Sequence, residues 1–433
     1  MASNLFLQKK SDTGSWHAWR FWIGRPMLCL YLFASLLFAP ACGDSGQTIS
    51  PVPNLKIGLL LPKSGAGQSV GESSEAAANR ALQAVNNYLA STGTTLKAEL
   101  VIKDTETNPD RALAQLKALY TEGVRLVVGP FASANAAAVL DYANQNGIVL
   151  LSPASQASSL AIPDDNLFRL VPGDGNQAAA MEALFDHDSI EVVIPVVRND
   201  VWGDGLVADV TQLLTLEGKT VVNPIFYDPS SLDASALAAQ AAAAINTVLL
   251  QTPAAQVGVY MLSFGEGSAI LEAAAQTPDC AKVRWYGSSA FANNASLPVS
   301  NPAAAFALQQ KFRCPSFAPD PAAADLWQPV DQQLAIQLGR QPEVFSLTSY
   351  DAVWLLVMAY RACADPSDIQ QFTSTLTQLA QNYYGITGRC AFDAAGDRKF
   401  ASFEFWGIAL PGSEYTWKAF GHYTNTTGQL VIY

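Results

Sequence analysis

The chain has 433 residues, of which 50% are hydrophobic and 14% are charged. That much apolar material can form packed cores, so the composition excludes a disordered or fibrous protein. The formal net charge is −12, and the small number of Lys and Arg residues argues against nucleic acid as a partner, because phosphate groups need clustered cations. Three histidines leave little room for a histidine-built metal site.

The N-terminal segment has the pattern of an export signal. Basic residues precede an apolar run over residues 27–39, whose length suits a signal-peptide core better than a membrane-spanning helix. Small residues before Cys42 resemble the lipobox of bacterial lipoproteins, in which the Cys is diacylated. Ala39 and Pro40 depart from the usual lipobox, so ordinary signal-peptidase cleavage nearby is the alternative. We predict a signal peptide over residues 1–41, a lipid anchor at Cys42 and a tether rich in Gly, Ser and Pro over residues 42–54.

The other cysteines also fit an exported protein. Outside the signal peptide and Cys42, the chain contains Cys280, Cys314, Cys363 and Cys390. In an oxidising compartment, four cysteines can form two disulfides in three ways. We predict that neighbours in sequence pair, Cys280 with Cys314 and Cys363 with Cys390. The alternative is four buried free thiols.

From residue 55 onwards, short apolar runs alternate with helical patterns. The first series is strand 55–61, helix 71–89, strand 96–102, helix 109–120, strand 125–128, helix 134–144 and strand 148–151. The second is strand 191–197, helix 205–216, strand 220–226, helix 234–249, strand 257–262, helix 268–275 and strand 283–286. Continuous apolar strands that alternate with helices indicate parallel sheets covered on both faces. The sequence therefore predicts two consecutive α/β units.

The last third does not keep this alternation. Residues 301–338 are rich in Ala and Gln and read as mostly helical, and helices are expected over 346–363 and 367–379. Two β-like stretches follow, at 388–392 and 402–410. This order predicts a chain that returns to complete both units.

One motif suggests an enzyme. Residues 67–71 match G-x-S-x-G, the nucleophile elbow of α/β-hydrolases, and Asp397 and His422 follow Ser69 in the right order for a triad. However, an elbow places Ser directly after a strand, and residues 62–67 intervene here. The same glycines are not followed by Gly-Lys-Ser/Thr, so a phosphate-binding loop is also unsupported. We therefore predict no catalytic residues.

The loops after the first-unit strands have the chemistry of a binding site. Hydroxyl groups and helix starts follow three strands, at residues 62–65, 129–133 and 152–156. In an open parallel sheet, ligands bind at the carboxyl ends of the strands. These loops contain no acid/base pair, no Cys/His pair and no metal cluster. We expect them to bind a small molecule without a cofactor or a metal.

These residues resemble the type I periplasmic binding proteins, in particular the branched-chain amino-acid (Leu/Ile/Val) receptor group of ABC importers. The resemblance covers residues 55–409. Its landmarks are Ile57-Gly58, Ser64-Gly65, Gly71, Asp104, Asn108-Pro109, Val128-Gly129-Pro130, Leu151-Ser152-Pro153-Ala154, Phe168-Arg169, Trp202-Gly203, Ser349-Tyr350-Asp351-Ala352, Gly388, Phe392-Asp393 and Gly396-Asp397.

The resemblance implies two Rossmann-like α/β lobes with parallel central sheets that close on a ligand like a Venus flytrap. Three crossovers would join the lobes, near Pro172, near residues 314–318 and near residues 390–397. The N-lobe would contain residues 55–172 and 318–389. The C-lobe would contain residues 173–317 and 390–433.

The resemblance also implies the ligand contacts. On the N-lobe side they are Ser64, Ser133, Ala154, Ser155 and Gln156, and on the C-lobe side Trp202, Phe264 and Ser289. Packing beside the hinge is the alternative role for Trp202 and Phe264. The equivalents of Ser133 and Gln156 bind the ligand carboxylate. Ser289 stands where an acid often binds the ligand ammonium, which places α-amino-acid specificity in doubt. Glu266 is the nearest other acid, and we interpret it as a solvated residue at a helix start.

The function implied is that of a monomeric, lipid-anchored solute receptor on the periplasmic side of the cell envelope. It would deliver an amino acid or a related carboxylate or amide to an ABC permease in the inner membrane. A regulatory lipoprotein of the same fold, such as an activator of cell-wall synthases, is the alternative, and the sequence does not separate the two.

Overall fold

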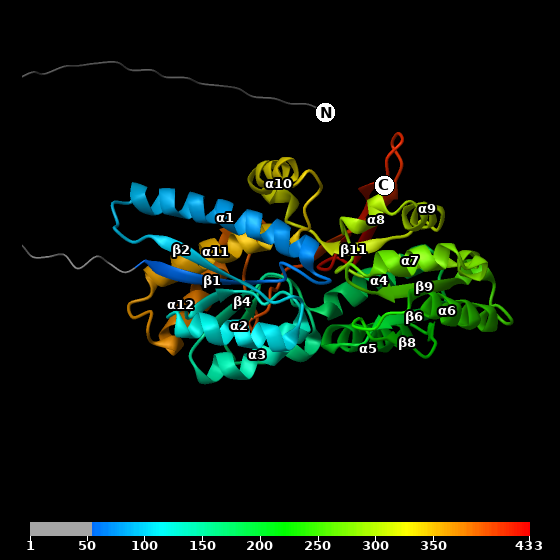
Figure 1. Ribbon diagram of the computed structural model, residues 1–433, viewed down its shortest axis with the longest axis horizontal. Coiled ribbons are helices and arrows are strands. Elements are labelled where there is room, and N and C mark those ends of the chain that lie inside the picture. Colours follow the sequence, from blue (N-terminus) through cyan, green and yellow to red (C-terminus); the bar gives the residue numbers. More distant parts are fainter. Residues whose placement is uncertain (1–53) are drawn as a thin grey trace, which may run out of the picture. The chain divides into compact units, whose positions relative to one another are not determined.

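The computed structural model describes residues 54–433, and the predicted signal peptide and the predicted lipid anchor at Cys42 lie outside them. The first sheet is parallel throughout and has the order β2-β1-β3-β4-β5. Its strands are β1 (Leu55–Leu61), β2 (Ala98–Asp104), β3 (Leu126–Val128), β4 (Val149–Ser152) and β5 (Leu167–Arg169). Its helices are α1 (Gln68–Ser91), α2 (Pro109–Thr121) and α3 (Ser133–Gln145), and the returning chain adds α11 (Phe345–Ala362) and α12 (Ile369–Asn382). Figure 1 shows these elements together in one half of the described chain.

The second sheet is also parallel, with the order β10-β9-β6-β7 and with β8 paired to β6. Its strands are β6 (Val192–Arg198), β7 (Thr220–Val221), β8 (Ile225–Tyr227), β9 (Val257–Leu262) and β10 (Arg284–Gly287). Its helices are α4 (Asp174–His187), α5 (Val201–Leu216), α6 (Ala234–Val248), α7 (Gly267–Ala275), α8 (Ser296–Val299) and α9 (Asn301–Gln309).

A third sheet is antiparallel and has the order β11-β14-β15-β16. Its strands are β11 (Cys314–Phe317), β14 (Ser402–Ala409), β15 (Thr416–Thr424) and β16 (Gln429–Ile432). Helix α10 (Ala324–Leu338) and the short pair β12 (Tyr384–Gly385) and β13 (Gly388–Arg389) lie between β11 and β14 in the chain. The α/β fold with two parallel central sheets confirms the fold class predicted from the sequence.

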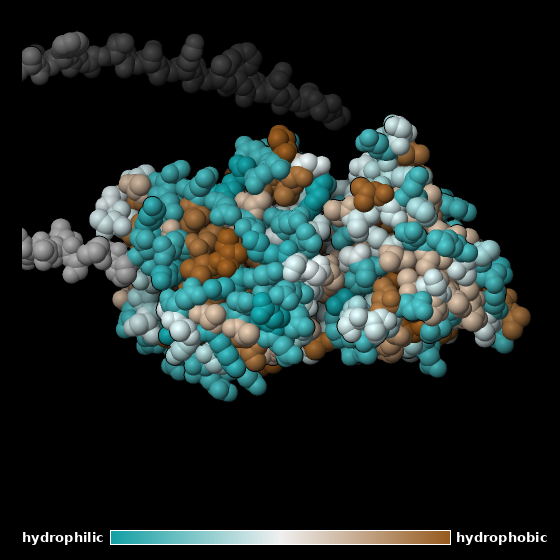
Figure 2. All heavy atoms as spheres, viewed as in Figure 1, coloured by the Kyte–Doolittle hydropathy of each residue, from teal (hydrophilic) through white to brown (hydrophobic). Residues whose placement is uncertain are grey.

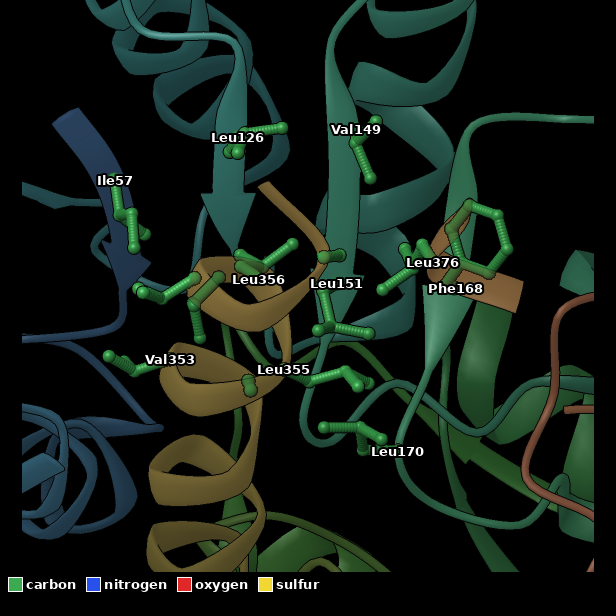
Figure 3. Close-up of a cluster of buried hydrophobic side chains, with 14 of the residues drawn as sticks. Ile57, Leu126, Val149, Leu151, Phe168, Leu170, Val353, Leu355, Leu356 and Leu376 are labelled. Carbon is green, nitrogen blue, oxygen red and sulfur yellow. The ribbon is translucent and has the colours of Figure 1, made fainter. Parts of the chain in front are cut away.

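We call the first sheet with its helices the first lobe, and the second and third sheets with the helices of the second the second lobe. Strand β1 illustrates why the first lobe folds as it does. Six of its seven residues are buried, and Lys56 alone is exposed in this strand. Figure 3 shows side chains of β1, β3, β4 and β5, such as Ile57 and Leu151, packed against side chains of α11, such as Leu356. Since helices cover both faces of the sheet, continuous apolar strands bury their side chains on either side.

The structure differs from the expected elements in several places, and one of them is strand β11, which lies within the stretch 301–338 that was expected to be mostly helical. The predicted strand 220–226 is two strands, β7 and β8, with Pro224 between them, and Pro has no N–H to donate to a neighbouring strand. Helix α4 and the hairpin of β15 and β16 were not predicted. Cys390 and Phe392 pack in the core of the first lobe, so the third crossover begins after Phe392.

The predicted disulfides are wrong. The structure shows Cys280, Cys314, Cys363 and Cys390 as free, buried thiols. Cys280 and Cys314 pack in a core of the second lobe, and Cys363 and Cys390 pack in the first. Each therefore serves as a small apolar side chain, and burial raises the pKa of the Cys390 thiol to about 12.

We expect thiol labelling to distinguish the two states. In denatured but unreduced protein, all four described cysteines should react with a maleimide. In native protein they should react slowly, because burial keeps the thiols protonated and out of reach. Two or fewer reactive thiols after denaturation would contradict the free-thiol state.

The surface of the described residues is mixed in hydropathy. On the face drawn in Figure 2, hydrophilic residues predominate and hydrophobic residues form separate groups. Within residues 54–433, none of the helices combines the length and apolar character needed to cross a bilayer.

Candidate ligand-binding site

A cavity lies between the two lobes, at the carboxyl ends of their strands. Its volume is about 70 Å³. Aromatic and other apolar side chains form most of its wall, with polar side chains at a few positions. The polar lining residues are Ser69, Thr107, Ser133, Gln156, Asn294 and Glu343. A mostly apolar cavity with a few convergent polar groups is typical of a small-molecule site.

Ser133 contributes the clearest polar geometry. It is the first residue of α3, and its Oγ accepts hydrogen bonds from the backbone N–H groups of Gln156 and Ala157, both at 3.2 Å. These two bonds fix the position of the hydroxyl and leave its proton free to donate. The first N–H groups of α3 have no partner within the helix and no side-chain cap. This corner of the cavity therefore presents donors suited to a carboxylate.

Gln156 links the two lobes. Its Oε1 accepts a hydrogen bond of 2.9 Å from Ser289 Oγ, and its Nε2 donates to Pro172 O at 3.2 Å. Ser289 N in turn donates to Gln177 Oε1 of α4 at 2.8 Å. All three side chains are buried. The lobes are therefore held together beside the cavity by a chain of hydrogen bonds.

Aromatic side chains of the second lobe form the opposite wall. The ring centroids of Trp202 and Phe264 are 5.1 Å apart. The Arg198 guanidinium lies over the Phe264 ring, 4.3 Å from its centroid, and pairs with Glu266 and Asp200 at 2.6 Å. Trp202 is the second residue of α5, whose N-cap Asp200 accepts from Trp202 N at 3.0 Å. Glu266 is thus held in an ion pair, and our interpretation of it as a solvated residue is wrong.

Glu343 is a lining residue that the sequence did not reveal. It precedes α11 and is 5% exposed. Its Oε1 accepts from Ser69 Oγ, and its Oε2 accepts from Ser73 Oγ at 2.5 Å and from Arg340 at 3.0 Å. Oε1 therefore retains room for another donor. Among the described residues that line the cavity, it is the only acid.

The structure brings five of the predicted ligand residues into the lining and leaves three outside it. Ser133, Ala154, Gln156, Trp202 and Phe264 line the cavity. Ser64 Oγ instead donates to Asp104 at 2.8 Å, Ser155 Oγ donates to Ser152 at 2.8 Å, and Ser289 makes the inter-lobe bond.

The residues of the hydrolase motif do not meet. Ser69 lies in the first turn of α1 and donates to Glu343, Asp397 pairs with Arg169, and His422 bonds Thr424 on β15 at 3.0 Å. Gly71, the last residue of the motif, lets α1 approach the preceding loop, because an added Cβ would lie 2.1 Å from Pro62 O. The glycines of this motif thus serve close packing at the edge of the cavity.

The chain belongs to the periplasmic binding protein family, whose model matches residues 54–404. A curated relative is an uncharacterized protein of Methanocaldococcus jannaschii, 24% identical over 87% of this chain and 91% of its own length. Another is Leu/Ile/Val-binding protein homolog 1 of Brucella melitensis, 23% identical over 86% of this chain and 94% of its own. The family description indicates an extracytoplasmic, solute-binding role.

Solved structures agree with this fold. A leucine-binding protein of Thermotoga maritima has a TM-score of 0.67 and 19% identity, covering 84% of this chain and 98% of its own. A solute-binding protein of an ABC transporter from R. palustris, in complex with benzoate, has a TM-score of 0.66 and 20% identity, covering 85% of this chain and 96% of its own. Both likenesses support the type I periplasmic binding protein fold.

Proposed function

We propose that the protein is the solute receptor of an ABC importer and binds a small carboxylate with an apolar body, such as an aliphatic amino acid or an aromatic acid. In this proposal, residues 55–172 and 318–392 close on the ligand against residues 173–317 and 393–433. The observation that carries the proposal is the pairing of a carboxylate-binding corner at Ser133 with the apolar wall of Trp202 and Phe264. The ligands named for the relatives, Leu/Ile/Val and benzoate, share this chemistry.

The size of the cavity indicates a closed arrangement. About 70 Å³ is well below the roughly 300–1,000 Å³ of typical ligand pockets, so a ligand of this class must push the lobes apart. Opening breaks the bond between Gln156 and Ser289. We propose that a bound ligand replaces this bond with its own contacts to both lobes.

The experiment that tests the proposal is a calorimetric titration with leucine, 4-methylpentanoate, isopentylamine and benzoate. We expect a carboxylate from this panel to bind and the amine, which has no carboxylate, to fail. Ser133→Ala should weaken binding about 10- to 100-fold, because a hydrogen bond to a charged group contributes roughly 1.5–3 kcal/mol.

Ser155→Ala is the matched control for this titration. Ser155 is on the loop that also carries Gln156, but its hydroxyl is bonded to Ser152 and does not line the cavity. We expect its effect on affinity to stay below about threefold, which is less than 1 kcal/mol. Equal losses in the two variants, or binding of the amine alone, would contradict the carboxylate site.

Lipid anchoring at Cys42 remains part of the proposal. Cys42→Ala should move the protein from the membrane fraction to the soluble fraction, because the diacylglyceryl group is bound to that thiol and Ala has no group that can accept it. Fractionation followed by immunoblotting measures this shift. Retention of the variant in the membrane fraction would favour ordinary cleavage and another mode of attachment.

A regulatory role is the second candidate. In that case the same cavity would bind the ligand, but the closed form would bind a partner protein other than a permease. Uptake assays in cells that lack the protein separate the two: a transport receptor is required for accumulation of the radiolabelled ligand, and a regulator is not.

A further inference from the structure

A second pocket lies outside the cleft, and we propose that it binds a small organic cation. Its volume is about 260 Å³, and its wall combines two indole rings with two carboxylates. The indoles are Trp327 and Trp406, and the acids are Asp331 and Glu404. This site goes beyond the solute-receptor function and does not depend on it.

Helix α10 provides one side of the pocket. Trp327 and Asp331 are four residues apart, so they lie on one face of the helix. Asp331 Oδ2 accepts a hydrogen bond of 2.9 Å from Gln341 Nε2, which also lines the pocket. This bond holds the carboxylate beside the indole of Trp327.

Strand β14 provides the opposite side. Glu404 and Trp406 are two residues apart and half-buried. Phe403, which precedes Glu404, and Phe405, which lies between the two, are buried in the core of the second lobe. The alternation of side chains in a strand therefore places Glu404 and Trp406 on the face away from that core. The register shifts between Phe405 and Trp406, as at a β-bulge, which re-aims side chains at this position.

The charges in the pocket are not balanced by the protein. No Lys, Arg or His is among the described lining residues, and neither Asp331 nor Glu404 has an ion-pair partner within residues 54–433. Burial raises the pKa of both carboxyls. The hydrogen bonds from Trp406 to Glu404 and from Gln341 to Asp331 offset part of this rise, and the charge of Asp331 adds to the rise at Glu404. A bound cation would relieve both effects.

A buried acceptor without a partner also points to a ligand. Asn293 lines the pocket, is 4% exposed, and its Oδ1 has no hydrogen-bond partner among residues 54–433. A primary ammonium group such as ethylammonium, attracted to the two indoles and two carboxylates, can also donate to such an oxygen, whereas a quaternary ammonium, which has no N–H, would be held by the indoles and carboxylates alone. No group of three metal-ligating side chains occurs in the described part of the chain, so this chemistry suits an organic ammonium better than a bare metal ion.

The pocket adjoins the segment that closes the cleft. Glu343 and Phe345 line the cleft, whereas Gln341, Pro342 and Val344 line the second pocket. The two cavities are therefore separated by one short stretch of chain. A cation in the second pocket would contact the same segment that places Glu343 beside the ligand.

Calorimetry with choline, tetramethylammonium and ethylammonium tests the proposal on the whole exported chain. We expect at least one of the three to bind and 3,3-dimethylbutan-1-ol, the neutral isostere of choline, to bind at least tenfold more weakly. Glu404→Gln and Asp331→Asn should each weaken the cation about tenfold. Asp325→Asn, at an exposed position on α10 outside the lining, should change affinity less than twofold.

The outcome that overturns the proposal is equally specific. The proposal fails if none of the three cations binds, if the alcohol binds equally well, or if binding survives both acid substitutions. Loss of cation binding in Trp202→Leu with retention in Trp327→Phe would place the cation in the cleft and also overturn it. If an acid variant fails to fold, Trp327→Phe tests the same site, and we expect it to weaken cation binding at least threefold.

Discussion

Replacing Arg169 with Met is expected to lower the free energy of unfolding by about 3–5 kcal/mol, because it leaves a buried carboxylate without its partner. Arg169 is fully buried, and its Nε and Nη2 donate to the two oxygens of Asp397. Nη1 also donates to Ala157 O at 2.8 Å. Urea denaturation followed by circular dichroism measures the loss.

The position of this pair explains why its loss should affect the whole molecule. Arg169 ends β5 just before the first crossover, and Asp397 lies in the third, where the two residues form a bridge beside the first sheet. Breaking the pair therefore loosens two crossovers at once. Removing both charges in Arg169→Met/Asp397→Leu should recover part of the stability, because no isolated charge then remains buried.

A surface ion pair provides the control for Arg169. Lys282 and Asp279 are separated by 2.7 Å, but both side chains are more than one-third exposed. Solvent screens such a pair, so Lys282→Met should cost less than about 1 kcal/mol. A loss in Arg169→Met as small as this, or a double variant less stable than the single ones, would contradict the assigned role.

The fold could be predicted because its signals are local. Strand β1 is a continuous apolar run, and α2 begins with Asn108, whose side chain accepts from Arg111 N, followed by Pro109 at the first helical position. Helix α4 lacked such a signal, since Ala178, Ala179 and Ala180 give little contrast between its buried and exposed faces. Its place became clear only once the second sheet had formed.

Part of the candidate site could be predicted from the sequence, and Glu343 could not. Ser133, Gln156 and Trp202 follow strand ends, and parallel strands bring those ends together. Glu343 lies in an irregular segment between α10 and α11, and only the folded chain places it beside Ser69 of α1. No pattern in the sequence records a contact between residues so far apart.

The cysteines show a different limit. The number of cysteines and the expected oxidising compartment favoured two disulfides, but neither observation says how far apart the thiols lie in the folded chain. A disulfide needs Cα atoms within about 7 Å and suitably directed side chains, which spacing in the sequence does not establish. In the structure, Cys280 Sγ instead lies 3.5 Å from Ala238 O, and Cys390 Sγ lies 3.5 Å from Gly388 O.

Asp174 should make the protein less stable as the pH rises from about 4 to about 8. It is fully buried in the first turn of α4, and burial, together with the charge of Asp209, raises its pKa to about 8. Between these pH values the folded state keeps a proton that the unfolded state has released. The free energy of unfolding therefore falls as the pH rises through this window, and the contribution is constant below about pH 4.

Asp174→Asn should remove this slope, because the amide is a neutral mimic of the protonated carboxyl. A difference of one between the pKa values of the folded and unfolded states corresponds to about 1.4 kcal/mol, so the variant should gain about 2–5 kcal/mol relative to the wild type between pH 4.5 and pH 8.5. Urea denaturation at the two pH values measures this gain, and Asp325→Asn, at an exposed site, should run parallel to the wild type. Parallel curves for Asp174→Asn would mean that the carboxylate is ionised and paired in the folded state.

Asp174 also lies beside the bond that joins the lobes. Its backbone N–H donates to Gln156 O at 2.8 Å, and Gln177 of the same helix accepts a hydrogen bond from Ser289 N. Ionisation of Asp174 would therefore weaken the helix end that anchors both partners of the inter-lobe bond.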